Sequence, residues 1–255
     1  MKHFGLIGRT LSHSFSKKFF TTKFSNEDID ANYSNYELPN IEAFPSLFAN
    51  DVILNGLNVT IPYKEDVIKY LDELDQVADE IQAVNTILPV YNNGNLKKLI
   101  GYNTDVYGFS QLIKPYLKSN HQKALVLGTG GASKAVSYVL RNLGVEVNYV
   151  SRSGSNIHSN VFSWDMVNNN MIKFHQLIIN TTPIGMSPNT KEVIPIPYTS
   201  ITNNHLLIDL IYNPEETQFL KRGKQQGARC LNGTNMLIHQ AIKAWNIWNF
   251  EHSIQ

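Results

Sequence analysis

Lys64 and Asp105 are two side chains that could exchange or hold a proton beside a bound substrate. Lys64 ends the segment NVTIPYK (58–64) and Asp105 ends YNTD (102–105), and each segment follows an apolar, strand-like run. An ammonium group can give a proton to a developing alkoxide, and a carboxylate can orient that ammonium group. Taken singly, Lys64 could be a solvated lysine and Asp105 a helix cap. The two residues therefore predict proton-transfer chemistry only as a pair.

Neutral hydrogen-bonding side chains occur in segments that alternate with the same strands. SHSFS (12–16) and VNT (84–86) are two further examples. Ser14 and Ser16 could both donate to one carboxylate, or they could cap the helix that begins near them. Because open α/β sheets bind ligands at strand ends, we expect these segments to line a ligand pocket.

GTGGASKA (128–135) has the spacing of a nucleotide-binding turn. KALVL (123–127) before it is strand-like, an amphipathic helical pattern follows it, and VEVNYV (145–150) is a second strand. In such a unit the first glycine permits a tight turn, and the second lets backbone amides approach a pyrophosphate. Ser133 stands where the third glycine usually does, so the motif is a variant, and a structural turn is the alternative. The predicted cofactor residues here are Gly128, Gly130, Gly131 and Ala132.

The second strand ends in SRS (151–153), where an NAD-binding unit usually carries Asp or Glu. A carboxylate would repel a 2′-phosphate, whereas Arg152 could form charge-assisted hydrogen bonds to it, flanked by Ser151 and Ser153. The segment therefore favours NADP over NAD, with a solvated loop arginine as the alternative. Further apolar runs that could extend a parallel sheet follow at 175–180, 205–211 and 228–231.

The elements that must position these residues alternate between strand and helix, which predicts a two-domain α/β fold. We assign residues 104–233 to a Rossmann-like, doubly wound nucleotide-binding domain, and 1–103, completed by 234–255, to a substrate-binding catalytic domain. Pro62 suits the first turn of a helix. In the first domain we expect strands at 3–8, 32–38, 54–61, 83–90 and 99–103, and helices near 15–24, 41–49 and 63–80.

Composition limits the partners. The chain has 255 residues, 42% hydrophobic and 17% charged, with a formal net charge of +1, so it has no overall field suited to nucleic acid or an anionic membrane. Its one cysteine, Cys230, excludes an internal disulfide framework and a cysteine-based zinc site. No signal-peptide pattern or membrane-length apolar run is present. We expect a cytoplasmic protein with small-molecule partners and no metal, either a monomer or a homodimer.

Nine ordered segments resemble the shikimate dehydrogenase family. They span residues 12 to 241, and their order is far more specific than any one motif. The segments are SHSFS, NVTIPYK, AVNT, GYNTD, GTGGASKA, SRS, NTTPIGM, DLIYNPEET and NGTNMLIHQA.

The resemblance implies NADPH-dependent, reversible reduction of 3-dehydroshikimate to shikimate, a step of aromatic amino acid biosynthesis. It implies that Lys64 is the catalytic lysine and Asp105 its partner, that Ser14 and Ser16 hold the substrate carboxylate, and that the last helix returns to the substrate domain. Further implied substrate contacts are Asn58, Thr60, Asn85, Tyr212 and Gln240. The later motifs add Thr181, Ile211 and Gly233 to the cofactor site.

The chain departs from the family pattern at Thr10 and Lys17, where prolines are usual, and at GSN (154–156), which lacks a second basic residue. NADP selectivity then depends on Arg152 alone. Three alternatives stay open: a quinate or dual quinate/shikimate dehydrogenase that accepts NAD, a catalytically silent nucleotide-sensing homologue, and a folate-pathway dehydrogenase of similar architecture. The paired Lys64 and Asp105 count against the second, and the S-x-S motif counts against the third.

Overall fold

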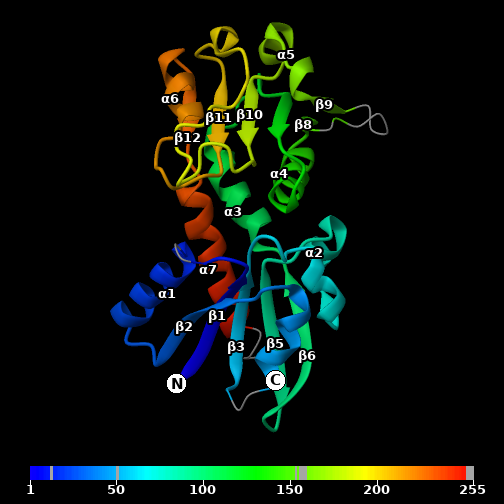
Figure 1. The fold of residues 1–255 in the computed structure, drawn as a ribbon, viewed down its shortest axis with the longest axis vertical. Helices are drawn as coiled ribbons and strands as arrows, with labels where there is room; N and C mark the ends of the chain where they lie inside the picture. The colour runs from blue at the N-terminus through cyan, green and yellow to red at the C-terminus, as the bar shows by residue number, and fades with distance from the viewer. Residues whose placement is uncertain (12–13, 50–51, 153, 155–159, 251–255) are drawn as a thin grey trace. The chain divides into compact units, whose positions relative to one another are not determined.

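Two six-stranded sheets organise the chain, one in each of two units. The structure, a computed structural model, describes residues 1–11, 14–49, 52–152, 154 and 160–250 (Figure 1). The first unit contains Met1–Gly108 and Leu237–Gln255, and the second contains Phe109–Met236. Helix α3 (Thr104–Ile113) and helix α7 (Thr234–Phe250) each contribute residues to both units.

The first unit holds a mixed sheet with strand order β2-β1-β3-β5-β6-β4. Strands β1, β2 and β3 are parallel, β5 runs antiparallel to β3, and β6 runs antiparallel to β5. The ends of β1, β3 and β6 and the start of β5 therefore lie at the same edge of the sheet. The strands are β1 (Lys2–Gly8), β2 (Ala31–Glu37), β3 (Leu54–Val59), β4 (Glu73–Leu74), β5 (Thr86–Asn92) and β6 (Asn95–Tyr102).

Each face of this sheet carries its own core. Helices α1 (Phe15–Asn26) and α7 cover one face, where Phe4, Phe20 and Trp248 pack together. The Trp248 indole N–H donates to the carbonyl of Ile87 (3.1 Å), which fixes α7 on the sheet. The other face is covered by the 3₁₀ helices η1 (Ile41–Phe48) and η2 (Asp66–Tyr70) and by α2 (Gln76–Ile81).

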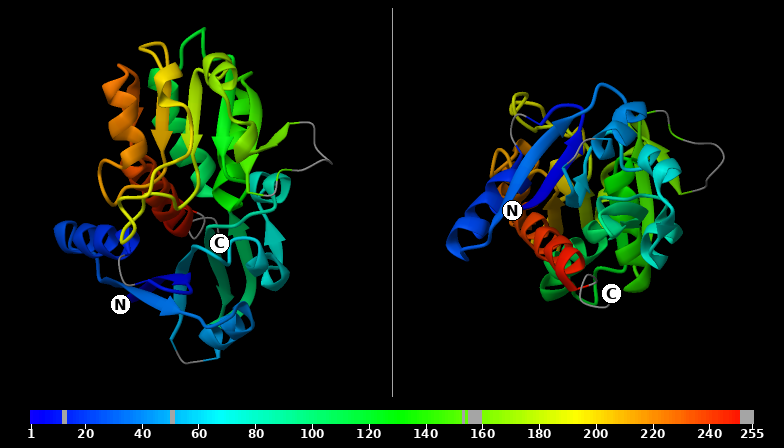
Figure 2. Two further views of the ribbon diagram at one scale, coloured as in Figure 1. Left: turned by 45° about the horizontal axis from the view of Figure 1, so that its top comes forward. Right: turned by 90° about the horizontal axis from the view of Figure 1, so that it is seen from below.

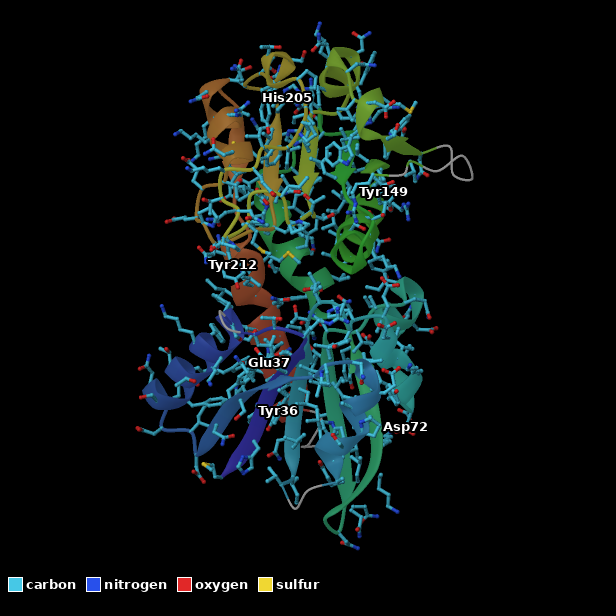
Figure 3. The ribbon with its side chains drawn as sticks, in the orientation of Figure 1. Tyr36, Glu37, Asp72, Tyr149, His205 and Tyr212 are labelled. Carbon is cyan, nitrogen blue, oxygen red and sulfur yellow. The ribbon has the colours of Figure 1, made fainter. Side chains whose placement is uncertain are left out.

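The helix expected over residues 63–80 is wrong. Pro62 lies in a turn that follows β3, and the chain then forms η2, β4 and α2 in succession. The expected helix is interrupted at Asp72, which lies beside β6 (Figure 3). Its backbone N–H donates to the Leu99 carbonyl (3.0 Å), and its carboxylate accepts from the Leu99 N–H (2.7 Å). Pairing with the sheet edge overrides the local helical pattern.

The second unit holds a fully parallel sheet with strand order β12-β11-β10-β7-β8-β9. Counted from β7, this is the doubly wound order 3-2-1-4-5-6, whose direction of winding reverses between β7 and β10. Ligands bind beside the carboxyl ends of strands at such a reversal. The strands are β7 (Lys123–Leu127), β8 (Glu146–Ser151), β9 (Val161–Ser163), β10 (Leu177–Asn180), β11 (Leu206–Asp209) and β12 (Arg229–Leu231).

Helices complete the second unit. Helix α4 (Gly131–Asn142) packs on β7 and β8, and α6 (Gln218–Gln225) packs on β11 and β12 (Figure 2). Buried Ile172 of α5 (Asn169–Phe174) and Phe219 of α6 join the apolar strand residues in one core. Within the described residues, no helix has the length and hydropathy needed to cross a membrane. Three 3₁₀ turns complete this unit: η3 (Lys114–Tyr116), η4 (Trp164–Met166) and η5 (Tyr198–Ser200).

Candidate active site

Lys64 and Asp105 form an ion pair, with 2.6 Å between Nζ and Oδ2. Their side chains are 16% and 4% exposed, so the pair is largely shielded from water. The Lys64 carbonyl accepts from the Val84 N–H (2.7 Å), which ties the turn after β3 to the start of β5. Asn103 provides the α3 capping bond, because its Oδ1 accepts from the Val106 N–H (3.3 Å). Asp105 is therefore a member of the ion pair, and the alternative that it caps the helix is wrong.

Asn58, Asn85 and Gln240 belong to one hydrogen-bond network beside this pair. Asn58 Nδ2 donates to the Asn85 carbonyl and to Thr86 Oγ1 (both 3.1 Å). Asn85 Oδ1 accepts from the Thr104 N–H (2.7 Å), and its Nδ2 donates to Gln240 Oε1 (3.2 Å). Thus α7 supplies a side chain to the same edge of the sheet as β3, β5 and β6. Thr86 and Thr104 are network members that the sequence analysis did not single out.

Tyr33 is a third member of the network that sequence reasoning missed. Its hydroxyl donates to Asn58 Oδ1 (2.8 Å), and the Ser16 side chain lies near that hydroxyl. Burial raises the pKa of Tyr33 well above its usual value, so the phenol stays protonated and remains a donor. A tyrosine in a predicted strand carries no functional signal, because only the packing of α1 on β1 and β2, in the sheet that also contains β3, brings these three side chains together.

Ser14 and Thr60 have backbone roles at the same edge. The Ser14 hydroxyl caps α1 by accepting from the Lys17 N–H (3.0 Å), which is the capping alternative for this residue. A hydroxyl that accepts still has a hydrogen to donate, so capping does not prevent ligand binding. Thr60 follows β3, and its N–H donates to the Ile7 carbonyl (2.9 Å), while its side chain is half-buried.

Replacement of Tyr33 by Phe is expected to lower the free energy of unfolding by about 1–3 kcal/mol, because it leaves the buried Asn58 Oδ1 without its tyrosine donor. Chemical denaturation would measure the change. Tyr36→Phe is the matched control on the same strand, because Tyr36 is only half-buried and water can replace its hydroxyl (Figure 3). Equal losses in the two variants would show that the Tyr33 hydroxyl has no special place in the network.

The glycine turn has the geometry of a phosphate-binding loop. Gly128 has φ +107°, and a Cβ there would lie 2.8 Å from Thr181 Oγ1, so a side chain would be strained and crowded. Gly130 precedes α4 with no side-chain cap, its missing Cβ would meet open space, and the first helical turn, which includes Gly131 and Ala132, contains no acidic residue. The helix N-terminus therefore keeps amide donors and a positive dipole end for an anion.

Strands β8 and β10 flank the glycine turn. The Gly128 N–H donates to the carbonyl of Val150 in β8 (2.8 Å). Ser151, the last residue of β8, and Arg152, which follows it, therefore lie close to the glycine turn. Ser151 is half-buried and Arg152 is exposed. Thr181 bonds to the Leu127 carbonyl through both its N–H (3.0 Å) and its hydroxyl (2.7 Å). The predicted residue Ser153 lies outside the described residues.

Ile211 and Gly233 lie together, because the Gly233 N–H donates to the Ile211 carbonyl (3.2 Å). A Cβ at Gly233 would lie 2.1 Å from the Leu210 carbonyl oxygen, so only glycine fits there. Tyr212 follows β11 in the second unit and is half-buried (Figure 3). The three residues lie beyond the carboxyl ends of β11 and β12, so Tyr212, predicted as a substrate contact, lies in the same unit as the predicted cofactor residues Ile211 and Gly233.

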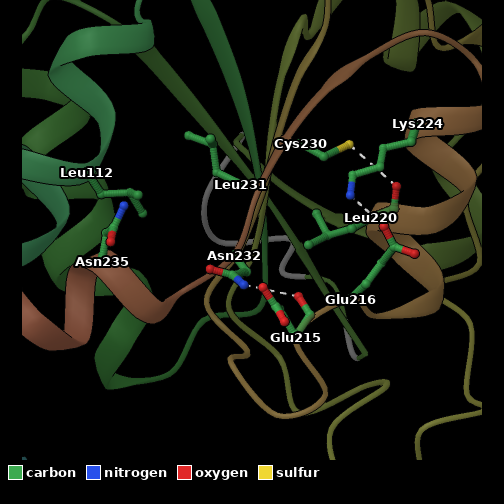
Figure 4. A pocket seen from close by; sticks show the side chains of 9 residues that line it. All are labelled: Leu112, Glu215, Glu216, Leu220, Lys224, Cys230, Leu231, Asn232 and Asn235. Carbon is green, nitrogen blue, oxygen red and sulfur yellow. Dashed lines mark hydrogen bonds and ion pairs between the residues drawn. The ribbon is translucent and has the colours of Figure 1, made fainter.

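A separate cavity of about 480 Å³ lies in the second unit (Figure 4). Its lining includes Cys230, Asn232 and the Glu216–Lys224 ion pair, and none of the predicted site residues. Burial raises the pKa of the Cys230 thiol to about 11, so it stays protonated near neutral pH and is a poor nucleophile. The cavity therefore does not compete with the strand-end sites as a reactive centre.

Comparison with known proteins agrees with this geometry. The family model for the shikimate dehydrogenase substrate binding domain matches residues 6–87. The NADP(+) shikimate dehydrogenase of Methanosphaera stadtmanae is 38% identical over 96% of this chain and 90% of its own length. That of Clostridium beijerinckii is 41% identical over 97% of this chain and 92% of its own length.

Solved structures extend the likeness to both units. Shikimate 5-dehydrogenase from Thermus thermophilus, solved with NADP(H) and shikimate, has a TM-score of 0.84 at 29% identity and covers 98% of this chain and 94% of its own. Quinate dehydrogenase from Corynebacterium glutamicum, solved with NAD, has a TM-score of 0.82 at 26% identity and covers 97% of this chain and 93% of its own. One architecture thus serves two substrates and two cofactors.

Proposed function

The chain belongs to the shikimate dehydrogenase family, and from this premise we propose that it catalyses the NADP-dependent, reversible conversion of 3-dehydroshikimate to shikimate. It is an oxidoreductase that acts on one ring position of a small hydroxy acid. The observation that carries the proposal is the shielded Lys64–Asp105 pair, with 2.6 Å between Nζ and Oδ2, at the edge of a polar strand-end network. A family member without catalytic function would have no need of this pair.

The two residues divide the proton chemistry between them. NADPH, when bound, supplies a hydride to the carbonyl carbon of the ring. The electron pair of the C=O bond moves to its oxygen, and Lys64 Nζ gives that oxygen a proton. In the reverse direction, neutral Lys64 takes the proton from the ring hydroxyl. Asp105 holds Lys64 in place through the ion pair and so orients the reacting oxygen of the ring relative to Nζ.

Neutral side chains bind the rest of the ring in this proposal. Ser14 and Ser16 donate to the carboxylate, and Asn58, Thr60 and Asn85 meet the hydroxyl groups, with Gln240 and Tyr212 completing the set. The network supports this assignment because Tyr33, Asn58, Asn85 and Gln240 are joined by successive hydrogen bonds, with Ser16 near the Tyr33 hydroxyl. Residues fixed by one another need little reorganisation when the substrate binds.

The second unit would hold the cofactor. Gly128, Gly130, Gly131 and Ala132 leave the α4 N-terminus open to a pyrophosphate, and Arg152 with Ser151 meets the 2′-phosphate. Thr181, Ile211 and Gly233 line the remaining strand ends. We assign the nucleotide function to residues 104–233 and the substrate function to 1–103 with 234–255.

The test is the initial rate of nicotinamide reduction with shikimate or quinate, each combined with NADP or NAD. A strong preference for shikimate with NADP would support both the pocket and the role of Arg152. Comparable rates with quinate or NAD would instead identify a dual dehydrogenase. No rate in any combination, together with measurable cofactor binding, would identify a nucleotide-binding homologue without catalysis.

A further inference from the structure

Asp209 is a fully buried carboxylate at the end of β11, with 0% of its surface exposed. Its Oδ1 accepts from Asn180 Nδ2 (2.9 Å) and from the Ile211 N–H (3.1 Å), and its Oδ2 accepts from Thr217 Oγ1 (2.5 Å). These donors come from the end of β10, the loop after β11 and the cap of α6. One side chain therefore joins three segments at the carboxyl edge of the sheet.

The partners of Asp209 are in turn bonded to the segments that carry the proposed cofactor residues. Asn180 Oδ1 accepts from the Thr182 N–H (2.9 Å) and hydroxyl (2.6 Å), which fixes the loop that contains Thr181. The Ile211 carbonyl accepts from the Gly233 N–H (3.2 Å). Ile211 is thus bonded directly to the Asp209 carboxylate, and Gly233 is bonded to Ile211. Thr181 follows Asn180, which is itself bonded to Asp209.

Burial of the ionised Asp209 carboxylate lowers the free energy of unfolding. None of the ion pairs among the described residues includes Asp209. Tyr198, whose ring lies 5.4 Å from the Arg222 guanidinium, is the titratable group that the Asp209 charge influences. Burial raises the pKa of Asp209 to about 6, so the folded protein binds this proton more tightly than the unfolded chain does. Stability contributed by the protonated form is therefore lost as the pH rises toward 6, and above that pH the ionised group remains a fixed cost.

We propose that Asp209 is a positioning residue for the nicotinamide cofactor, whose carboxylate holds the loops after β10 and β11 in the shape that binds NADP. The inference rests on the proposed function. It explains why a buried charge is kept where an amide would satisfy the same space at lower cost. Asp209 does not touch the reacting atoms, and it acts through Asn180, Ile211 and Thr217.

Asp209→Asn is the central variant, because it preserves the shape of the side chain and removes the charge. The group that faces Thr217 then changes from acceptor to donor, and the bonds to Asn180 and Ile211 lose their charge assistance. The Kd for NADP⁺, measured by titration calorimetry at pH 8, is expected to rise about 10-fold. The KM for shikimate is expected to stay within about twofold of wild type, as is typical when a mutation spares the site concerned. Asp165→Asn, an exposed carboxylate in the same unit, is the matched control.

Two readouts separate positioning from a merely structural role. Asp209→Asn should unfold at no lower temperature than wild type at pH 8, since it removes the cost of ionisation, even though cofactor binding weakens. The ratio of the two NADP⁺ Kd values should fall toward one as the pH drops below about 6, because protonated Asp209 then resembles Asn. Titration of the cofactor's 2′-phosphate affects both proteins and cancels in the ratio.

If Asp209→Asn fails to fold, Thr217→Val and Thr217→Ser still test the positioning role of Asp209. The serine variant keeps the hydroxyl that bonds to Asp209 and should bind NADP⁺ as wild type does, whereas the valine variant should bind it more weakly. An unchanged Kd in Asp209→Asn, or a Kd ratio that does not vary with pH, would overturn the inference and leave the proposed function intact. A wild-type protein that binds no nicotinamide cofactor would overturn both.

Discussion

Lys64→Ala is expected to lower kcat by about 10²- to 10⁴-fold, the usual contribution of a positioned general acid or base. The variant removes the group 2.6 Å from Asp105 that is proposed to deliver the proton to the ring oxygen. Steady-state rates in both reaction directions would measure the loss. Because the proton is needed in the transition state and not for binding, KM for shikimate should change far less than kcat.

Lys64→Arg distinguishes proton transfer from simple charge pairing. Arginine would keep a cation beside Asp105 but holds its proton at any pH the protein survives, so the variant should fold normally and still lose most of its turnover. Lys69→Ala is the control, since Lys69 of η2 is an exposed lysine paired with Glu42 of η1. Near-native turnover in a folded Lys64→Ala would refute the assigned role.

Arg152→Ala is expected to lower kcat/KM for NADP by about 10- to 150-fold, the value of about 1.5–3 kcal/mol for one charge-assisted hydrogen bond. Rates with NAD, which has no 2′-phosphate, should stay close to those of wild type. The ratio of the two specificity constants is therefore the quantity to measure. Arg141→Ala provides the control, because Arg141 is also an exposed arginine in the second unit and lies over the Tyr149 ring.

Equal losses with both cofactors would mean that Arg152 supports the loop and does not select the phosphate. This outcome matters because GSN (154–156) supplies no second basic residue. The 2′-phosphate would then be met by the Ser151 hydroxyl without help from a cation.

The strands of the second unit were the best predicted from the sequence, because strands buried in a parallel sheet are continuous apolar runs. KALVL was predicted as a strand over 123–127, and β7 has those bounds. The family and the two-domain α/β fold were predicted correctly as well. The residues 63–80 were misassigned because a helical pattern cannot reveal that Asp72 pairs with Leu99 across the chain.

The candidate site shows the same limit. Lys64 and Asp105 could be chosen by residue type, but only the strand directions bring their side chains to 2.6 Å. Tyr33 and Asp209 were missed because each lies in or at the end of a strand and owes its role to partners from distant segments. Burial turns an ordinary tyrosine and an ordinary aspartate into functional candidates, and burial is a property of the packed fold.

Helix α7 sets the order in which this protein can fold as the ribosome makes it. Residues Leu237–Phe250 belong to the first unit, yet they are synthesised after the whole second unit. Until they emerge, Phe4 lacks Trp248, whose ring stacks on it with centroids 4.9 Å apart, and the covered face of the first sheet stays open. The second unit can therefore fold on the nascent chain first, while the first unit, although its synthesis starts earlier, is completed last.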